Sequence, residues 1–178
     1  MYKPIVNFWF EEIDPSQWWE KDDTFDALLL ERFSEIHNRA KRCELFEWRS
    51  KAEGRLAEII ILDQFSRNMF RGSALAFAND AMALILSQEA VACGADQDLT
   101  PVQRSFLYMP YMHSESLEIH EVAVALFRKN GFQNNLEFEY SHKKFIEKFG
   151  RYPHRNKILG RQSTSEEIEF LKQPGSSF

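Results

Sequence analysis

The sequence lacks most of the features that mark exported or membrane-bound proteins. It has only two cysteines, Cys43 and Cys93, which lie fifty positions apart without a C-x-x-C pair. We therefore expect buried, free thiols in a reducing compartment. The apolar run near the N-terminus is too short for a signal peptide, and no stretch approaches the roughly 18 apolar residues of a membrane span. These absences predict a cytoplasmic protein without membrane contact.

Common catalytic motifs are missing as well. The chain has no nucleophile elbow, P-loop, Rossmann glycine pattern or H-E-x-x-H, and Gly54 and Gly72 do not form a phosphate loop. The sequence therefore predicts no cofactor and leaves open whether the protein is an enzyme.

Strand signals are nearly absent too, since the one β-branched run, at 59–61, lies inside a segment with helical periodicity. What the chain has in quantity is apolar surface: 44% of its 178 residues are hydrophobic and 14% aromatic. This is ample for one packed domain spanning residues 1–178.

Helix start and stop signals divide this domain into helices. Ser50 and Glu53 form a capping-box pattern, Thr100 precedes Pro101 and Gln103, and residues 163–167 offer Ser163 or Thr164 as a cap. Glycines mark the stops, at positions 72, 94, 131, 150 and 160. We expect helices near 4–13, 25–43, 51–71, 81–93, 101–112, 115–129, 135–149, 153–159 and 165–172. The fold class predicted is all-α, with about eight or nine helices in antiparallel pairs joined by short loops.

Charge is unevenly distributed along the chain. The net charge of −5 argues against nucleic-acid binding, which depends on neutralising phosphates. Residues 142–162 nevertheless carry seven Lys or Arg against Glu147 alone, a local net charge of +6. Such asymmetry indicates either an anionic partner or a solvated basic face.

The segment 59–71 places a carboxylate on an apolar helix face. Asp63 shares one side of the helix with Ile59, Ile60 and Phe70, and Arg67 follows four residues later, at ion-pair spacing. A lone carboxylate on such a face is costly unless it is paired. Two interpretations stay open: a structural ion pair, or an Asp63 that orients a basic group toward a ligand.

A second polar motif occupies residues 108–120. Pro110 should kink or end the helix there, and Ser114 is a candidate N-cap that places His113 and Glu115 at the next helix start. His113, Glu115 and His120 are metal-ligand types, but a spacing of seven positions from His113 to His120 does not match zinc spacing. The prediction is therefore no metal site, with a histidine on the apolar stripe hydrogen-bonded in the core.

The third motif, "FGRYPHRNKILGR" at 149–161, is the most basic. Gly150 should end one helix and Pro153 begin a short one, so that His154, Arg155 and Asn156 lie at its N-terminus, where backbone N–H groups attract anions. Alternatively, Arg151 and Arg155 pair with acidic side chains elsewhere in the chain.

Taken together with "ILDQFSRNMFRG", "FLYMPYMHSESL" and the closing "PGSSF", these motifs resemble the bacterial uncharacterised proteins of domain-of-unknown-function family 924. The resemblance covers nearly the whole chain. It implies an all-helical fold like a tetratricopeptide-repeat right-handed superhelix or a compact helical array, and no established activity. Two positions depart from the family pattern: Ser66 replaces a usual Pro, and His120 a usual Gln.

These motifs lead us to expect a small-molecule site that binds an anionic ligand. Arg151 and Arg155 would hold the anion, His113 or His154 would move a proton, and Asp63 or Glu115 would orient them. The full set of predicted ligand-binding residues is Asp63, Arg67, His113, Glu115, Arg151, His154, Arg155, Asn156 and Arg161. Two alternatives remain: a protein-interaction module that holds a peptide or partner helix on a concave face, and a purely structural polar network. A homodimer is also left open.

Overall fold

The computed structural model describes residues 1–177, which form helices and turns without any β-strand. The all-α prediction is therefore confirmed. The α-helices are α1 (Lys3–Asn7), α2 (Asp23–Lys41), α3 (Ala52–Ile60), α4 (Ser66–Met69), α5 (Asp80–Ala92), α6 (Pro101–Met112), α7 (Leu117–Asn130), α8 (Gln133–Phe149) and α9 (Ser165–Phe170). Two π-helical segments, η1 (Phe8–Glu12) and η4 (Ile61–Phe65), and five 3-10 turns, η2 (Pro15–Trp18), η3 (Phe46–Ser50), η5 (Ala74–Ala76), η6 (Ala95–Asp98) and η7 (Pro153–Arg155), complete the described chain.

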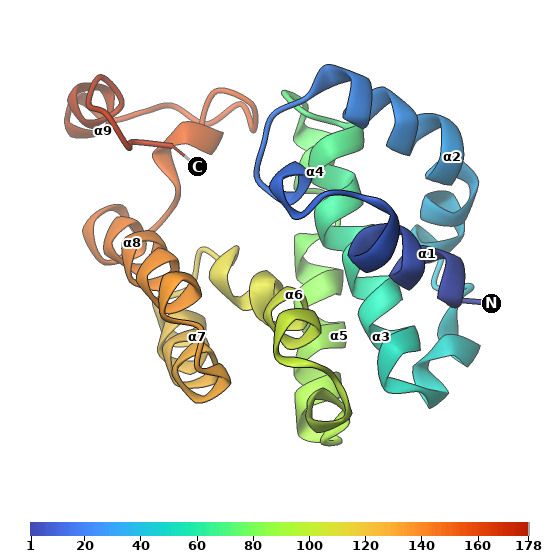
Figure 1. Ribbon diagram of the computed structural model, residues 1–178. Coiled ribbons are helices and arrows are strands. Elements are labelled where there is room, and N and C mark those ends of the chain that lie inside the picture. The colour runs from blue at the N-terminus through green and yellow to red at the C-terminus, as the bar shows by residue number, and fades with distance from the viewer. Residues whose placement is uncertain (178) are drawn as a thin grey trace.

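Helices that follow one another in sequence pack side by side. α5 packs against α3 and α6, α6 against α7, and α7 against α8. Figure 1 shows α1 to α5 on one side of the molecule, α7 to α9 on the other, and α6 between them. The tetratricopeptide-like superhelix and the extent of a single domain stay predictions.

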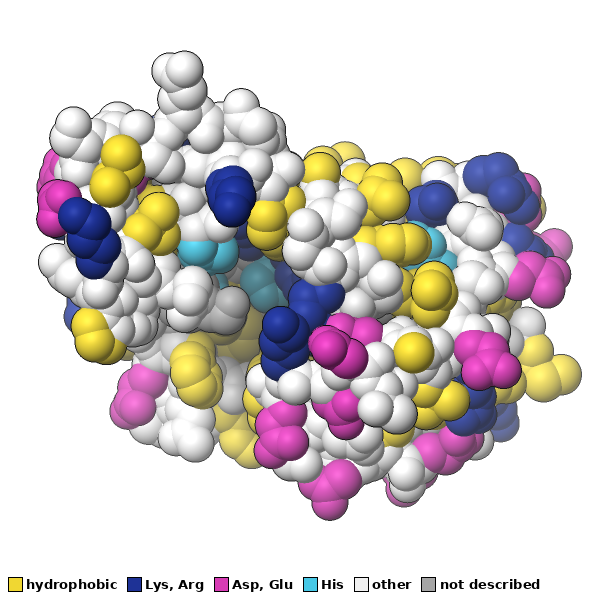
Figure 2. Space-filling view, turned by 90° about the horizontal axis from the view of Figure 1, so that it is seen from above, with side chains coloured by type: hydrophobic (Ala, Val, Ile, Leu, Met, Phe, Trp, Pro, Cys, Tyr) yellow, Lys and Arg dark blue, Asp and Glu magenta, His cyan; other side chains and the backbone are white. Residues whose placement is uncertain are grey.

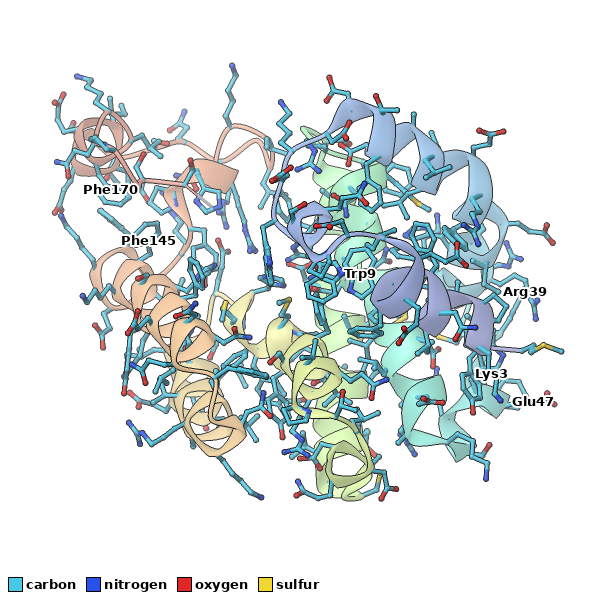
Figure 3. The ribbon with its side chains drawn as sticks, viewed as in Figure 1. Lys3, Trp9, Arg39, Glu47, Phe145 and Phe170 are labelled. Atoms are coloured by element: carbon cyan, nitrogen blue, oxygen red, sulfur yellow. The ribbon has the colours of Figure 1, made fainter. Side chains whose placement is uncertain are left out.

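The core between α1 and α6 is rich in aromatic rings. Trp9 is fully buried and points into this core (Figure 3), where its ring lies 5.7 Å from that of Phe106 and 5.6 Å from that of Phe65. On the other side of the molecule, Phe145 of α8 faces Phe170 of α9, with ring centroids 4.9 Å apart (Figure 3). Such edge-to-face pairs hold α9 onto α8.

Most of the helix signals act as the sequence predicts. Capping boxes start α6 at Thr100 and α9 at Thr164, which settles the choice left open at 163–167. Gly131 and Gly150 end α7 and α8 in the left-handed conformation that glycine adopts without strain. The cap predicted at Ser50 is wrong, because its hydroxyl donates to the carbonyl of Glu47 and the N-cap of α3 is Lys51.

The helix predicted over 51–71 is interrupted. After Ile60 the chain takes one π-helical turn, η4, and then continues as α4 to Met69. This turn contains Asp63. π-turns inside helices occur frequently at functional sites.

α6 covers the predicted range 101–112 and continues through Pro110, since the missing N–H removes only one hydrogen bond and the amide of His113 still closes the last turn on Met109. Two further predictions need correction. Only Pro153–Arg155 of the predicted helix 153–159 is helical, as a 3-10 turn. Both cysteines are free, but they are exposed rather than buried.

Within residues 1–177 no helix is both long enough and apolar enough to cross a bilayer.

Candidate functional site

The first two polar motifs meet at a carboxylate–histidine pair. Asp63, in the π-turn η4, is fully buried, and its Oδ1 lies 2.7 Å from Nδ1 of His113 at the end of α6. The amide of Gln64 donates to the other oxygen of Asp63 at 2.5 Å. A carboxylate on Nδ1 orients the imidazole and favours a proton on that nitrogen, which leaves Nε2 as the basic atom.

Two arginines and a second aspartate surround this pair. Arg67 lies 3.0 Å from Asp63 and binds Asp80, at the start of α5, through both terminal nitrogens at 2.9 and 3.0 Å. Arg155 reaches the same aspartate at 3.3 Å and donates to the carbonyl of His113 at 3.1 Å. We call these five residues, Asp63, Arg67, Asp80, His113 and Arg155, the His113 cluster. It joins elements of all three motifs.

The guanidinium of Arg155 is held between two aromatic rings. Its central carbon lies 4.6 Å from the ring centroid of Phe77 and 4.4 Å from that of Tyr152, and only 8% of the side chain is exposed. Nε is buried without a hydrogen-bond partner in residues 1–177. A buried cation with an unused donor is costly, so it points to a missing acceptor.

Electrostatics fix the charge state of the cluster. Burial disfavours the Asp63 carboxylate, but Arg67 and His113 outweigh it and hold its pKa well below the usual value. Burial and the charge of Arg67 lower the pKa of His113 despite the neighbouring Asp63. Two arginines therefore balance two aspartates around a neutral imidazole, and the cluster has no net charge.

Glu115 and Arg161 form a second ion pair next to the cluster. Arg161 binds both oxygens of Glu115 at 2.6 and 2.9 Å, and the other contact of Glu115 is the backbone N–H of Tyr152 at 2.7 Å. Burial raises the pKa of Glu115, but the hydrogen bonds from Arg161 and the Tyr152 amide, together with the charge of Arg161, outweigh burial and leave the pKa lowered. This pair ties the loop after α6 to the segment that carries Arg155.

Arg151 and Asn156 lie in a third polar group around Glu167. Arg151 binds both oxygens of Glu167 at 2.7 and 2.8 Å and donates to the carbonyl of Gln162, while Asn156 donates to Glu167 at 3.2 Å. The hydrogen bonds from Arg151 hold the pKa of Glu167 at about 2. This group anchors α9 and occupies Arg151, one of the two arginines that the sequence predicts as anion ligands.

The remaining histidines of this region are buried to different degrees. His154 is half-buried with its ring 5.6 Å from that of Tyr152, and burial together with Arg155 lowers its pKa to about 4. Burial likewise lowers the pKa of His142 to about 3. His120 is a hydrogen-bonded core residue, as predicted, in contact with Glu139 and the Ser114 carbonyl. No group of three or more metal-ligating side chains occurs in the described part of the chain.

Two predictions about local structure at the site are wrong. α7 begins at Leu117 with Ser116 as its N-cap, so His113 and Glu115 lie in the connection from α6 rather than at a helix start. Because residues 153–155 form only a 3-10 turn, in which the amides of Arg155 and Asn156 bond to preceding carbonyls, no helix N-terminus is available there for an anion.

Sequence reasoning missed three residues of the site. Asp80 carries no pattern beyond an acid in the first turn of a helix. Phe77 lies in a loop and carries no signal. Tyr152 stands between Arg151 and Pro153 in the third motif, and an aromatic residue among arginines is a signal for cation–π stacking.

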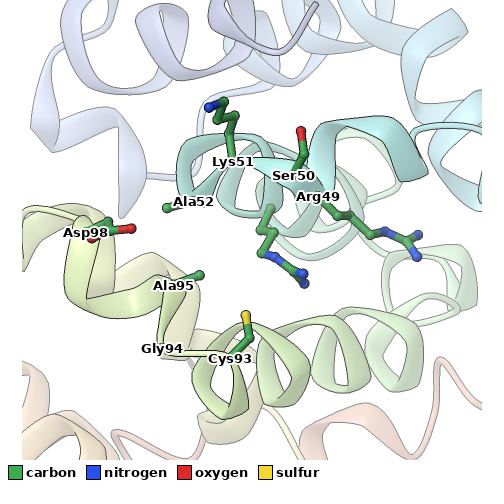
Figure 4. A pocket seen from close by; sticks show the side chains of 9 residues that line it. Arg49, Ser50, Lys51, Ala52, Cys93, Gly94, Ala95 and Asp98 are labelled. Carbon is green, nitrogen blue, oxygen red and sulfur yellow. The ribbon is translucent and has the colours of Figure 1, made fainter.

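The surface around this region is hollowed. Seen from above, the molecule shows a depression between two lobes, in which histidine side chains lie beside Lys and Arg side chains (Figure 2). A separate pocket of about 350 Å³ opens between the start of α3 and the end of α5, where Ser50, Ala52, Cys93 and Asp98 line it (Figure 4). That pocket shares no residue with the His113 cluster.

Comparison with known proteins identifies the family of this chain. Residues 5–175 match the family model described as "Bacterial protein of unknown function (DUF924)". No curated protein matches the chain. The solved structure of the protein of unknown function ATU0120 from Agrobacterium tumefaciens is 38% identical, with a TM-score of 0.91 over 96% of each chain. The predicted resemblance is therefore confirmed, and the chain belongs to the bacterial DUF924 family.

Proposed function

We propose that the His113 cluster binds a small anionic ligand, with Arg155 holding the anion and His113 exchanging a proton with it. The observation that carries the proposal is the buried guanidinium of Arg155 with its unpartnered Nε. Arginine binds carboxylate or phosphate through two parallel hydrogen bonds, so a carboxylate or phosphate group is the ligand chemistry that fits.

Arg155 is better suited to this role than the other basic residues of the third motif. The guanidinium groups of Arg151 and Arg161 each bind a carboxylate of the chain through two hydrogen bonds. Arg155 shares Asp80 with Arg67 through one terminal nitrogen. Arg155 is therefore the least completely paired of the three arginines, and the proposal assigns the anion to Arg155.

His113 would balance the charge of the bound anion. Asp63 occupies Nδ1, Nε2 has no hydrogen-bond partner among residues 1–177, and 14% of the side chain remains exposed. Because the cluster is neutral when empty, an added anion favours protonation of the imidazole. Binding should then take up a proton, and affinity should fall as pH rises. A histidine poised this way can serve as a general acid or base, which makes proton transfer to the ligand the chemistry to look for.

Isothermal titration with inorganic phosphate, acetate and succinate tests the proposal, with each titration repeated in two buffers of different ionisation enthalpy. We expect at least one anion to bind with proton uptake and more weakly at pH 8 than at pH 6. Absence of binding by all three anions at millimolar concentration would count against an anion site.

Matched variants separate this site from non-specific charge. Arg155→Gln should abolish binding, and His113→Asn, which keeps a donor for Asp63, should retain weaker binding without proton uptake. Arg151→Gln is the control, because its partner is Glu167 and it should leave affinity unchanged. Equal losses in Arg151→Gln and Arg155→Gln would refute the assignment.

A second candidate function is peptide or partner-helix binding, favoured by an apolar groove beside the first half of α6. This groove of about 130 Å³ lies between η2 and α6, where Trp19 and Phe132 are 61% and 39% exposed beside Phe106. Aromatic side chains exposed around a groove are typical of peptide recognition. A Trp19→Ala variant that captures the same peptides as wild type from a display library would argue against it.

A further inference from the structure

A second histidine–carboxylate pair lies next to the proposed ligand site, in contact with Tyr152, and is not part of the His113 cluster. His120 of α7 and Glu139 of α8 are both fully buried, and Nδ1 of the histidine lies 2.7 Å from Oε1 of the glutamate. The hydrogen bonds around this pair determine how many protons it holds.

The proton on Nε2 of His120 is fixed by its neighbours. Nε2 lies 2.9 Å from the carbonyl oxygen of Ser114, which can only accept, so Nε2 must carry a proton. The hydroxyl of Tyr152 lies 2.6 Å from the carbonyl of Met112 and 3.1 Å from Nε2. It therefore donates to Met112 and faces Nε2 as an acceptor.

With Nε2 protonated, the short contact between Nδ1 and Oε1 requires one more proton. The pair is either imidazolium with carboxylate or neutral imidazole with carboxylic acid, and both forms are neutral overall. We propose that His120 and Glu139 share one proton that stays bound in the folded protein well above neutral pH, and that this proton fixes the hydroxyl of Tyr152 on Met112.

Loss of that proton would leave a negative charge in a site closed to water. The second oxygen, Oε2 of Glu139, is buried without a hydrogen-bond partner in residues 1–177, so it has no donor to stabilise a carboxylate. If Nδ1 kept the remaining proton, Nε2 would present a lone pair to Ser114, and Tyr152 would have to turn away from Met112 to donate to it. If Nε2 kept it, Nδ1 and Oε1 would repel each other.

The surrounding charges do not replace the shared proton. Burial raises the pKa of Glu139 in spite of His120 and Lys143, and Lys143 also binds Glu121 at 2.8 Å. The titratable and charged groups that face the pair and Tyr152 from the packed elements are Glu121 of α7, His142 and Lys143 of α8, Glu115 and His113 of the α6–α7 connection, Arg67 of α4 and Arg155 of η7.

The pair has a consequence for the ligand site, since the ring of Tyr152 packs against Arg155. A fixed hydroxyl fixes this ring, so His120 and Glu139 act as positioning residues for the Arg155 guanidinium. The shared proton itself does not depend on whether the site binds an anion, and its test is carried out without a ligand.

The nitrogen-15 spectrum of the histidine side chains of the wild-type protein reads the proton directly. We expect His120 to show a protonated Nε2 and no titration between pH 6 and 8.5. A deprotonated Nε2 at neutral pH, or a midpoint inside this range, would overturn the proposal.

The pH dependence of the unfolding free energy gives an independent measure of how many protons the pair binds. Above pH 7 the unfolded histidine is neutral and the unfolded glutamate is ionised, so the folded state binds one proton more than the unfolded state. By linkage, this proton makes stability fall as pH rises, and the ratio of the wild-type unfolding constant to that of a variant without the shared proton should increase about tenfold per pH unit between pH 7 and 8.5 in urea titrations.

Two glutamine variants of α8 complete this measurement. Glu139→Gln can donate to Nδ1 without an extra proton, so this contribution to the pH dependence should disappear. Glu137→Gln, two residues earlier and exposed, should keep it. Equal slopes in Glu139→Gln and wild type would overturn the proposal, and if Glu139→Gln does not fold, the wild-type spectrum still decides.

Discussion

Replacing Asp63 by Asn removes the charge at the centre of the His113 cluster while keeping the size of the side chain. Asp63 is fully buried and is in contact with Arg67 at 3.0 Å and His113 at 2.7 Å. Removing one partner of a buried ion pair costs about 3–5 kcal/mol, because the other charge stays buried. Here Arg67 keeps Asp80 and its hydrogen bond to the backbone carbonyl of residue 63, so we expect the lower end, about 3 kcal/mol.

This loss should appear in urea unfolding at pH 7 and as a melting temperature lower by about 6–12 °C for a chain of this size. The control is Glu12→Gln, which breaks the bidentate pair of Glu12 with Arg32. These side chains are 46% and 40% exposed, so the change should lower the melting temperature far less than Asp63→Asn does.

Acid conditions provide a second check on the same variant. Because the folded pKa of Asp63 is lowered, its carboxylate stabilises the fold above the unfolded pKa of about 3.9, and this contribution is lost as pH falls below it. The stability difference between wild type and Asp63→Asn should therefore narrow below pH 4. A loss smaller than about 1 kcal/mol at pH 7, or a difference unchanged at acid pH, would refute the reasoning.

Two further predictions concern backbone packing and acid stability. Gly54→Ala should destabilise the fold by about 3 kcal/mol, because the new Cβ would lie 2.1 Å from the carbonyl oxygen of Trp48. Gly131→Asn is the control, since the space at its Cβ is open, and it should cost under about 1 kcal/mol. Equal melting temperatures for the two variants would contradict this prediction. Burial lowers the pKa of His37 to about 4 and of His142 to about 3, so the unfolded chain binds more protons than the folded one below about pH 6.5. Stability should consequently fall as pH drops from 6.5 to 4, and an unfolding free energy that stays constant over this range would show that these histidines are charged in the fold.

Local signals in the sequence predicted most helix ends. Thr100 with Gln103, Thr164 with Glu167, and the terminal glycines act within one helical turn, so their effect can be read from neighbouring residues. The π-turn around Asp63 gave no such signal. Its helix packs against α2, α5 and α6, and contacts between elements far apart in the chain cannot be read from neighbouring residues.

The candidate site, too, could be predicted from the sequence only in part. Arg67 could be paired with Asp63 from helical spacing alone, and their contact is present at 3.0 Å. That His113 would meet Asp63 across 50 positions could be expected only in outline, from polar residues on otherwise apolar helices. Asp80 and Phe77 could not be found at all, because nothing in the residues around them distinguishes them from ordinary surface positions.

By itself the sequence determined an all-helical chain, the positions where most helices begin and end, and the three segments that carry its polar chemistry. Only the tertiary structure decided which arginine is neutralised by which acid. Arg151 pairs with Glu167 across 16 positions, Arg161 with Glu115 across 46, and Arg155 shares Asp80 across 75. The choice among them depends on distances of a few ångströms between helices, since the energy of a charge pair is set by separation and burial, and neither quantity is encoded in spacing along the chain.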